Sequence, residues 1–162
     1  MFGDPSWDFR SFDYDHDVER AIAYGSGAID VPPTGLGHFF AGNRKLLLSH
    51  GWADGLIPPQ STVNFYQALV KDIGQRRAQE DVRLFMVPGM GHCGGGSGPS
   101  NVDMLGAIDQ WVQTGKAPDQ LVASNPPGRP ARTRPLCAHP KVAAYSGHGN
   151  TDEAQNFHCA GP

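Results

Sequence analysis

Two short apolar runs with a helical pattern between them constrain the fold of this chain more than any other feature of its sequence. The runs lie in residues 45–49 and 83–87, and each leads into a glycine-containing turn. An apolar run bounded by turns is typical of a buried strand. Between them, residues 60–73 carry apolar side chains at spacings of three and four, the pattern of a helix with one buried face. Strand, helix and strand in this order predict parallel strands joined by a right-handed crossover.

Two further helices and a turn are expected around this unit. A short helix is predicted within residues 13–23, a solvated turn at residues 75–81, and a second amphipathic helix over residues 102–112. Ser100 or Asn101 is the expected cap of that last helix. Its predicted buried stripe consists of Val102, Leu105, Ile108, Trp111 and Val112.

The predicted sheet is too small to be stable alone. We assign residues 1–124 to an α/β core and residues 125–162, where Pro and Gly interrupt any period, to an irregular tail packed on that core. Parallel sheets are normally covered on both faces, and their edges are protected, so two parallel strands imply missing neighbours. We therefore expect the chain to be the C-terminal part of a longer α/β protein.

Composition argues against several classes of partner. The 162 residues suffice for one domain with a core, and the net charge of -3, without a basic stripe, argues against nucleic-acid binding. No apolar run approaches the ~20 residues that a membrane span needs. The first residues have neither the basic region nor the apolar region of a signal peptide.

The three cysteines, Cys93, Cys137 and Cys159, allow two interpretations. In the first, Cys137 and Cys159 form a disulfide around a polar loop, which would stabilise the fold by about 3 kcal/mol. Cys93 would then have its partner outside this chain. In the second, all three are free thiols in a reducing compartment. A disulfide would indicate an oxidising compartment, but the sequence shows no export signal. The two observations agree if the chain is the C-terminal part of a longer protein.

Candidate catalytic side chains follow the two predicted strands. Asp54 lies just past the first strand and His92 just past the second, at the edge of an α/β sheet where ligands gather. An acid that orients an imidazole, which activates a nucleophile, is the logic of a serine hydrolase triad. In α/β-hydrolases the order along the chain is Ser, Asp, His, with the serine in a G-x-S-x-G turn. That frame is absent around Ser26, Ser49, Ser97 and Ser146.

The pair therefore predicts an acid and a base without their nucleophile and oxyanion hole. Two other interpretations of these residues stay open. Such a pair can arise by chance in an α/β protein, and a metal site could join His50, Asp54, His92 and Cys93, although their spacing matches no zinc pattern. The glycines around His92, which permit close approach of a ligand, favour the triad.

Several segments resemble the C-terminal region of the tannase and feruloyl esterase family. They are DPSWDFRSFDYDHDVERA, SHGWADGLIPPQSTVNFY, RLFMVPGMGHCGGGSGPSNVDMLGAIDQWVQTGKAPDQLVAS, RTRPLCAHPKVAAY and TDEAQNFHCAGP. The resemblance covers nearly the whole chain, and GMGHCGGG, with Cys directly after His, is its most specific part.

The resemblance implies an α/β-hydrolase fold and a role for five residues. Asp54 would be the triad acid, His92 the general base, and Cys93 half of a disulfide to a cysteine beside the catalytic serine. Cys137 and Cys159 would form a second disulfide. No cofactor is implied for this chain, since the calcium site of the family belongs to an upstream lid domain.

The implied function is hydrolysis of aromatic-acid esters, galloyl or hydroxycinnamoyl, by a secreted or periplasmic protein. The missing N-terminal part of the same protein would be its partner, and the chain alone should be inactive. Two alternatives stay open: another α/β-hydrolase, such as a prolyl-oligopeptidase-like peptidase, whose pattern has no Cys after the His, and a non-catalytic remnant.

Overall fold

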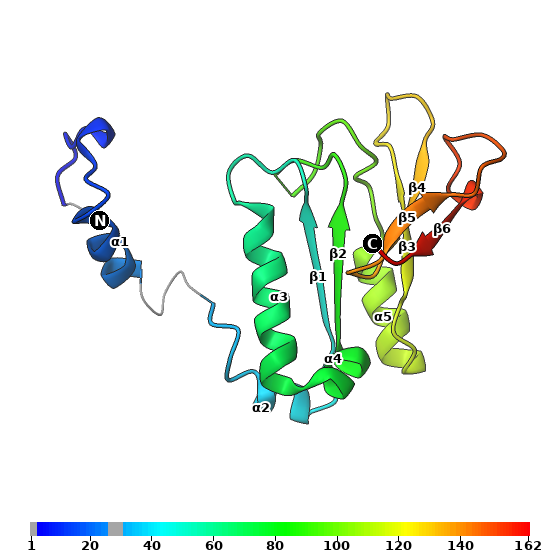
Figure 1. Cartoon of the computed structure of the whole chain (residues 1–162), viewed down its shortest axis with the longest axis horizontal. Helices are drawn as coiled ribbons and strands as arrows, with labels where there is room; N and C mark the ends of the chain where they lie inside the picture. The colour runs from blue at the N-terminus through cyan, green and yellow to red at the C-terminus, as the bar shows by residue number, and fades with distance from the viewer. Residues whose placement is uncertain (1–2, 26–30) are drawn as a thin grey trace. The chain divides into compact units, whose positions relative to one another are not determined.

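A computed structural model describes residues 3–25 and 31–162. The chain divides into two units, Met1–Pro32 and Pro33–Pro162 (Figure 1). The first unit contains the short 3-10 helix η1 (Phe9–Ser11) and the helix α1 (Asp17–Gly25), which confirms the helix expected near residues 13–23. Acidic side chains in the first turn of α1 suit the positive end of its dipole. No helix in the described ranges has the length and apolar character to cross a membrane.

The second unit is organised around the predicted strand, helix and strand. Strand β1 (Leu46–Gly51), helix α3 (Pro59–Ile73) and strand β2 (Val82–Val87) follow in order, and β1 pairs with β2 in parallel from Leu46 opposite Val82 to Gly51 opposite Val87. The parallel crossover is therefore confirmed for these two strands. Figure 1 shows that the loops after both strands lie at the same end of the sheet.

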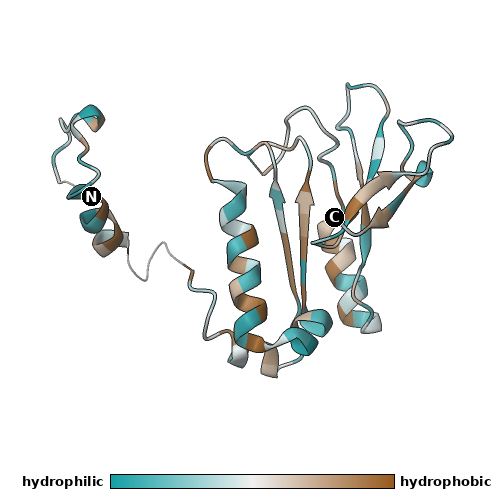
Figure 2. Ribbon diagram, in the orientation of Figure 1, coloured by the Kyte–Doolittle hydropathy of each residue, from teal (hydrophilic) through white to brown (hydrophobic). Residues whose placement is uncertain are grey.

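The two strands are buried to different degrees. Every residue of β2 except Arg83 is buried, and Val82, Leu84 and Phe85 expose nothing to solvent. The three leucines that begin β1 are only partly buried. Within the described residues β1 pairs only with β2, so its other edge carries no strand. Figure 2 shows β1 changing from brown to teal toward its carboxyl end, where the polar site residues begin.

Residues 75–81 form a helix, which corrects the expected solvated turn. Helix α4 (Gln75–Asp81) has no apolar period, but Ala78 is buried and Asp81 accepts hydrogen bonds from Arg77, 2.9 Å, and from Lys45, 2.5 Å. These contacts stabilise a helix that its charged sequence, without an apolar period, does not predict. The preceding short helix α2 (Gly37–Ala41) buries Phe40 beside α3.

Helix α5 (Met104–Thr114) confirms the second amphipathic helix but corrects two details. Its cap is Asp103, whose Oδ1 accepts the Gly106 N–H at 2.8 Å, rather than Ser100 or Asn101. Trp111 is fully buried. Two other members of the predicted buried stripe, Leu105 and Val112, are exposed.

The tail from residue 125, together with the strand just before it, is more regular than the sequence indicates. Strand β3 (Gln120–Ser124) pairs antiparallel with β4 (Thr133–Cys137), β5 (Val142–Tyr145) pairs antiparallel with β6 (Phe157–Ala160), and the 3-10 helix η2 (Ala154–Asn156) precedes β6. The expected irregular tail is therefore wrong in this respect. The strands are short, β4 contains a proline, and the paired strands are joined by loops longer than the tight turns that mark a hairpin in sequence.

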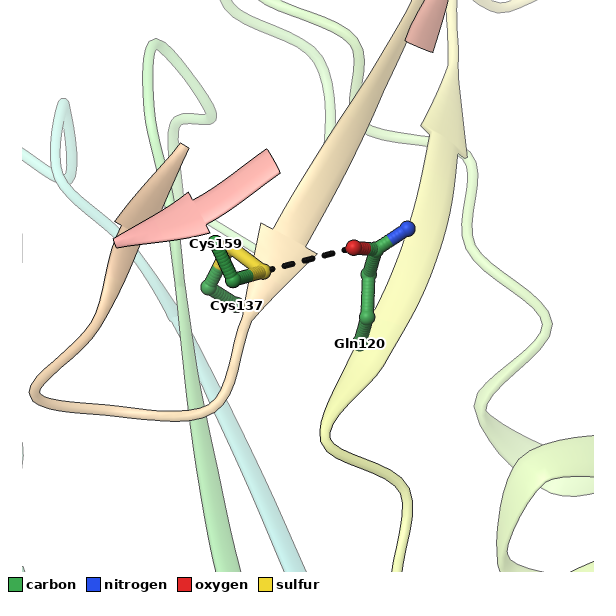
Figure 3. The surroundings of a disulfide bond; sticks show 3 residues. All are labelled: Gln120, Cys137 and Cys159. Atoms are coloured by element: carbon green, nitrogen blue, oxygen red, sulfur yellow. Dashed lines mark hydrogen bonds between the residues drawn. A yellow bond between two sulfur atoms is a disulfide. The ribbon is translucent and has the colours of Figure 1, made fainter. Parts of the chain in front are cut away.

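A disulfide and a backbone bond fasten this tail. Cys137 in β4 is bonded to Cys159 in β6, which confirms the pairing implied by the resemblance, and Figure 3 shows the side-chain oxygen of Gln120 beside Cys159. The backbone N–H of His139 donates to the Leu84 carbonyl at 2.8 Å. The tail is thereby held against β2, the strand that leads to the predicted base.

Candidate active site

Two loops at the carboxyl ends of β1 and β2 form the site. We name residues 51–57 the acid loop and residues 88–98 the histidine loop. The Trp52 N–H donates to the Val87 carbonyl at 2.9 Å, and the Ala53 N–H donates to the Met90 carbonyl at 3.0 Å. Gly51 permits this approach, because a Cβ there would collide with the Met90 carbonyl. The two loops are therefore joined backbone to backbone.

The histidine loop folds back on itself. The Gly98 N–H donates to the Gly89 carbonyl at 3.2 Å, and a Cβ on Gly96 would collide with that same carbonyl. At the tip of the loop, Cys93 has a positive φ of 43°, an uncommon conformation for a residue other than glycine. This close return places His92 beside the acid loop and leaves the Cys93 side chain exposed.

The carboxylate of Asp54 is buried and fully hydrogen-bonded. Its side chain exposes only 3% of its surface. Oδ1 accepts hydrogen bonds from the backbone N–H groups of Leu56 at 2.8 Å and Ile57 at 3.0 Å. Oδ2 accepts a hydrogen bond from Nδ1 of His92 at 2.7 Å. Burial raises the pKa of Asp54, but the Ile57 amide, the His92 ring and the Leu56 amide together outweigh it and hold the pKa well below its usual range. Asp54 is therefore ionised at neutral pH.

The ionised carboxylate fixes the protonation of His92. A carboxylate can only accept hydrogen bonds, so the Nδ1 atom that faces it must carry the proton. A neutral ring then has its free lone pair on Nε2. The His92 side chain is 43% exposed, and it lines a cleft of about 360 Å³. An imidazole oriented in this way by a buried acid is prepared to take a proton from a group in the cleft.

Residues from the carboxyl ends of β1 and β2, from both loops, from the first turn of α5 and from the segment before it line this cleft. They are Ser49, His50, Gly51, Asp54, Ile57, Val87, Met90, His92, Cys93, Ser100, Val102 and Met104. Two serines are thus present, but neither hydrogen-bonds the imidazole. Within residues 3–25 and 31–162, the His92 ring hydrogen-bonds only Asp54.

A second imidazole contacts the acid, and the sequence had suggested it only as a metal ligand. Nε2 of His50 lies 3.1 Å from Oδ2 of Asp54, and Nδ1 of His50 lies 2.6 Å from Oγ1 of Thr62. The signal in the sequence was the placement of His50 four residues before Asp54, at the end of a strand. That spacing does not reveal a contact with Thr62, which depends on where α3 packs.

The described residues contain no group of three or more His, Cys, Asp or Glu side chains arranged to hold a metal ion. In the candidate metal set of His50, Asp54, His92 and Cys93, the ring nitrogens of the two histidines that face Asp54 carry protons. Neither of these nitrogens can bind a cation while it donates to the carboxylate. Cys93 forms no disulfide with Cys137 or Cys159, which are bonded to each other.

Comparison with known proteins gives the family. Residues 3–160 match the model of a family described as tannase and feruloyl esterase. The chain belongs to this family. An uncharacterized esterase of Xanthomonas campestris is 34% identical to it over 97% of this chain and 34% of its own length. Mono(2-hydroxyethyl) terephthalate hydrolase of Piscinibacter sakaiensis is 41% identical over 80% of this chain and 22% of its own length.

Part of a solved esterase structure has the same fold as this chain. The crystal structure of feruloyl esterase B from Aspergillus oryzae matches 98% of this chain with a TM-score of 0.85 and 25% identity, over 35% of its own length. This chain therefore spans about a third of that enzyme and of the Xanthomonas relative. The family resemblance stated from the sequence is confirmed, whereas the catalytic roles of Asp54 and His92 stay a prediction.

Proposed function

We propose that this chain supplies the acid and the base of a serine hydrolase that cleaves carboxylic esters. The observation that carries the proposal is the 2.7 Å hydrogen bond from His92 Nδ1 to the buried Asp54, which leaves Nε2 free in the cleft. In the complete enzyme a serine hydroxyl attacks the ester carbonyl while Nε2 of His92 takes its proton. The same nitrogen returns a proton to the departing alcohol, and then activates the water that releases the acid. Asp54 stabilises the imidazolium formed at each transfer.

The substrate class we propose is the ester of an aromatic acid, galloyl or hydroxycinnamoyl. The family description and the names of the relatives support this class. The cleft is compatible with an aromatic ring, since Ile57, Met90 and Val102 contribute apolar surface beside the polar pair.

We further propose that the nucleophile comes from a segment outside these residues, so that this chain alone is inactive. Three observations support this. No G-x-S-x-G turn occurs in the sequence, and the relatives are about three times longer than their match to this chain. In the described residues, one edge of β1 also has no strand beside it, so its backbone N–H and C=O groups could pair with an additional strand.

Cys93 and the compartment follow from the same proposal. We infer that Cys93 is bonded to a cysteine beside that serine, which would hold the histidine loop near the nucleophile. Its exposed side chain at the tip of the loop is accessible for such a bond. The Cys137–Cys159 disulfide supports a secreted or periplasmic protein, because such bonds persist in oxidising compartments. The calcium site of the family would lie in an upstream lid domain.

The test compares this chain alone with a chimera. In the chimera, residues 3–162 replace the matching C-terminal region of Aspergillus oryzae feruloyl esterase B, and both proteins are assayed with methyl ferulate and with a fluorophosphonate that labels activated serines. We expect turnover and labelling only in the chimera. His92→Ala and Asp54→Asn should each lower kcat by at least about 10⁴-fold. His148→Gln is the matched control, because His148 lies in an exposed loop and, among the residues that the structure describes, bonds only the Ser146 carbonyl.

Two results would contradict the proposal. Turnover by the chain alone that disappears in His92→Ala would show that one of its own serines is the nucleophile. A folded chimera whose turnover survives both His92→Ala and Asp54→Asn would show that these residues are not the base and the acid.

A further inference from the structure

We propose that His50 and Thr62 are positioning residues for the catalytic pair, linked in a hydrogen-bonded chain Thr62–His50–Asp54–His92. The inference rests on the proposed function for its catalytic meaning, but its structural content can be tested without any substrate. His50 is the penultimate residue of β1 and Thr62 lies in the first turn of α3, so these hydrogen bonds link the strand and the helix on both sides of the acid loop.

The two imidazoles converge on one oxygen. Nε2 of His50 lies 3.1 Å and Nδ1 of His92 lies 2.7 Å from the same Oδ2 of Asp54. The other oxygen is occupied by two backbone amides of the acid loop. With four donors around it, the carboxylate is held against rotation about its Cβ–Cγ bond, and Oδ2 is kept in line with the His92 ring. His50 supplies one of those four donors.

The direction of the hydrogen bonds is set by the ionised acid. Asp54 accepts only, so His50 must carry its proton on Nε2. Nδ1 of a neutral His50 is then an acceptor, and the Thr62 hydroxyl, 2.6 Å away, donates to it. Within the described residues this is the only hydrogen bond of the Thr62 side chain. Asp54 thereby sets the tautomer of His50, and Thr62 satisfies the Nδ1 acceptor of that tautomer and holds the ring in place.

The choice of tautomer has a consequence for His92. If His50 carried its proton on Nδ1, its Nε2 lone pair would face Oδ2 and repel it, and the carboxylate would turn away from His92. The His50 side chain is 11% exposed and the Asp54 side chain 3%, so water has little access to repair such a mismatch. A neutral His50 also leaves the negative charge of Asp54 uncompensated, and therefore available to the His92 imidazolium.

The experiment is NMR of the ring nitrogens in the purified chain with ¹⁵N-labelled histidine at neutral pH. Long-range ¹H–¹⁵N correlations distinguish protonated from unprotonated ring nitrogens, and single His→Gln variants assign the rings. We expect the Nε2–H tautomer for His50 and the Nδ1–H tautomer for His92. Thr62→Val, which keeps the shape but removes the hydroxyl, should leave the His50 ring less firmly held and speed the exchange of the His92 Nδ1 proton with water about tenfold, the size of effect that one lost hydrogen bond produces.

Matched variants separate positioning from general damage. Thr62→Ser retains the hydroxyl and should restore the wild-type spectrum, and Ser61→Ala, which removes a neighbouring hydroxyl bonded to the Pro58 carbonyl, should leave it unchanged. His50→Phe should speed the exchange of the His92 Nδ1 proton, as Asp54→Asn should, while His50→Gln, with an amide donor, should retain part of the protection.

Finding the wild-type His50 protonated on Nδ1, or on both nitrogens, would overturn the proposal. An unchanged His92 spectrum in Thr62→Val and His50→Phe would overturn it as well. Because none of these signals depends on ester turnover, failure of the esterase assay and failure of this inference are separate results.

Discussion

Removal of the Cys137–Cys159 disulfide should cost this chain about 3 kcal/mol of folding free energy. The bond joins β4 to β6 across a separation of 22 residues. The change we consider is the double variant Cys137→Ala/Cys159→Ala, because one substitution alone would leave a reactive thiol. The single variant Cys93→Ala is the matched control, since Cys93 is free and exposed.

The magnitude follows from loop closure in the unfolded chain. A cross-link over the 22-residue separation removes about 11 cal/mol/K of conformational entropy from the unfolded state, which is about 3 kcal/mol at 25 °C. Contacts in the native tail that do not depend on the bond should survive, among them the stacking of Arg134 on Phe157, with the guanidinium 4.4 Å from the ring centroid. The loss should therefore be that of the unfolded-state constraint.

Urea denaturation followed by circular dichroism and by tryptophan fluorescence measures the effect. With a slope of about 2 kcal/mol/M, a loss of 3 kcal/mol lowers the midpoint by about 1.5 M. Cys93→Ala should shift it by less than about 0.3 M. A double variant that loses under about 1 kcal/mol with an unchanged slope would refute the reasoning. It would show that the tail unfolds separately, or that the unfolded chain is already compact.

Three further perturbations test the packing around the site and the core. Gly51→Ala places a Cβ against the backbone of the histidine loop and should cost about 1–3 kcal/mol by thermal melting, whereas Gly55→Ala, with no atom within 4 Å, should cost under about 0.5 kcal/mol. Lys45→Met leaves the buried Asp81 carboxylate with less compensation and should cost about 3 kcal/mol, most of it recovered in Lys45→Met/Asp81→Leu. Burial lowers the pKa of His139, so the folded state resists protonation of this side chain, and the free energy of unfolding should fall as the pH drops below about 6.5. The variant His139→Phe should reduce that fall. A variant whose stability has the same pH dependence as the wild type would contradict the prediction.

The parallel unit could be predicted because its signals are local. The apolar runs, the helical spacing of residues 60–73 and the turns after each strand all lie within short windows. Helix α4 could not be predicted in this way, because its stability depends on the burial of Ala78 and on the approach of Lys45 from 36 residues away. The tail strands are also short, and loops longer than a tight turn join the paired strands, so no hairpin signal marks them.

The position of the site could be predicted, but its hydrogen-bond network could not. Parallel pairing of β1 and β2 by itself brings Asp54 and His92 to the same edge of the sheet, so two residues far apart in sequence become neighbours. The sharing of one carboxylate oxygen between His50 and His92 depends on side-chain orientations and on the packing of α3, which brings Thr62 to His50. Neither the side-chain orientations nor the packing of α3 can be predicted from the sequence pattern.

The error in the predicted face of α5 supports the proposed extent of the protein. Val102, Ile108 and Trp111 are at least partly buried, but Leu105 is 83% exposed and Val112 57% exposed. The exposed Leu105 and Val112 and the half-buried leucines of β1 leave apolar surface in contact with water, which is unfavourable. A further segment packed over them would bury this surface. We propose that the apolar spacing of α5 reflects a further segment of the protein that covers Leu105 and Val112.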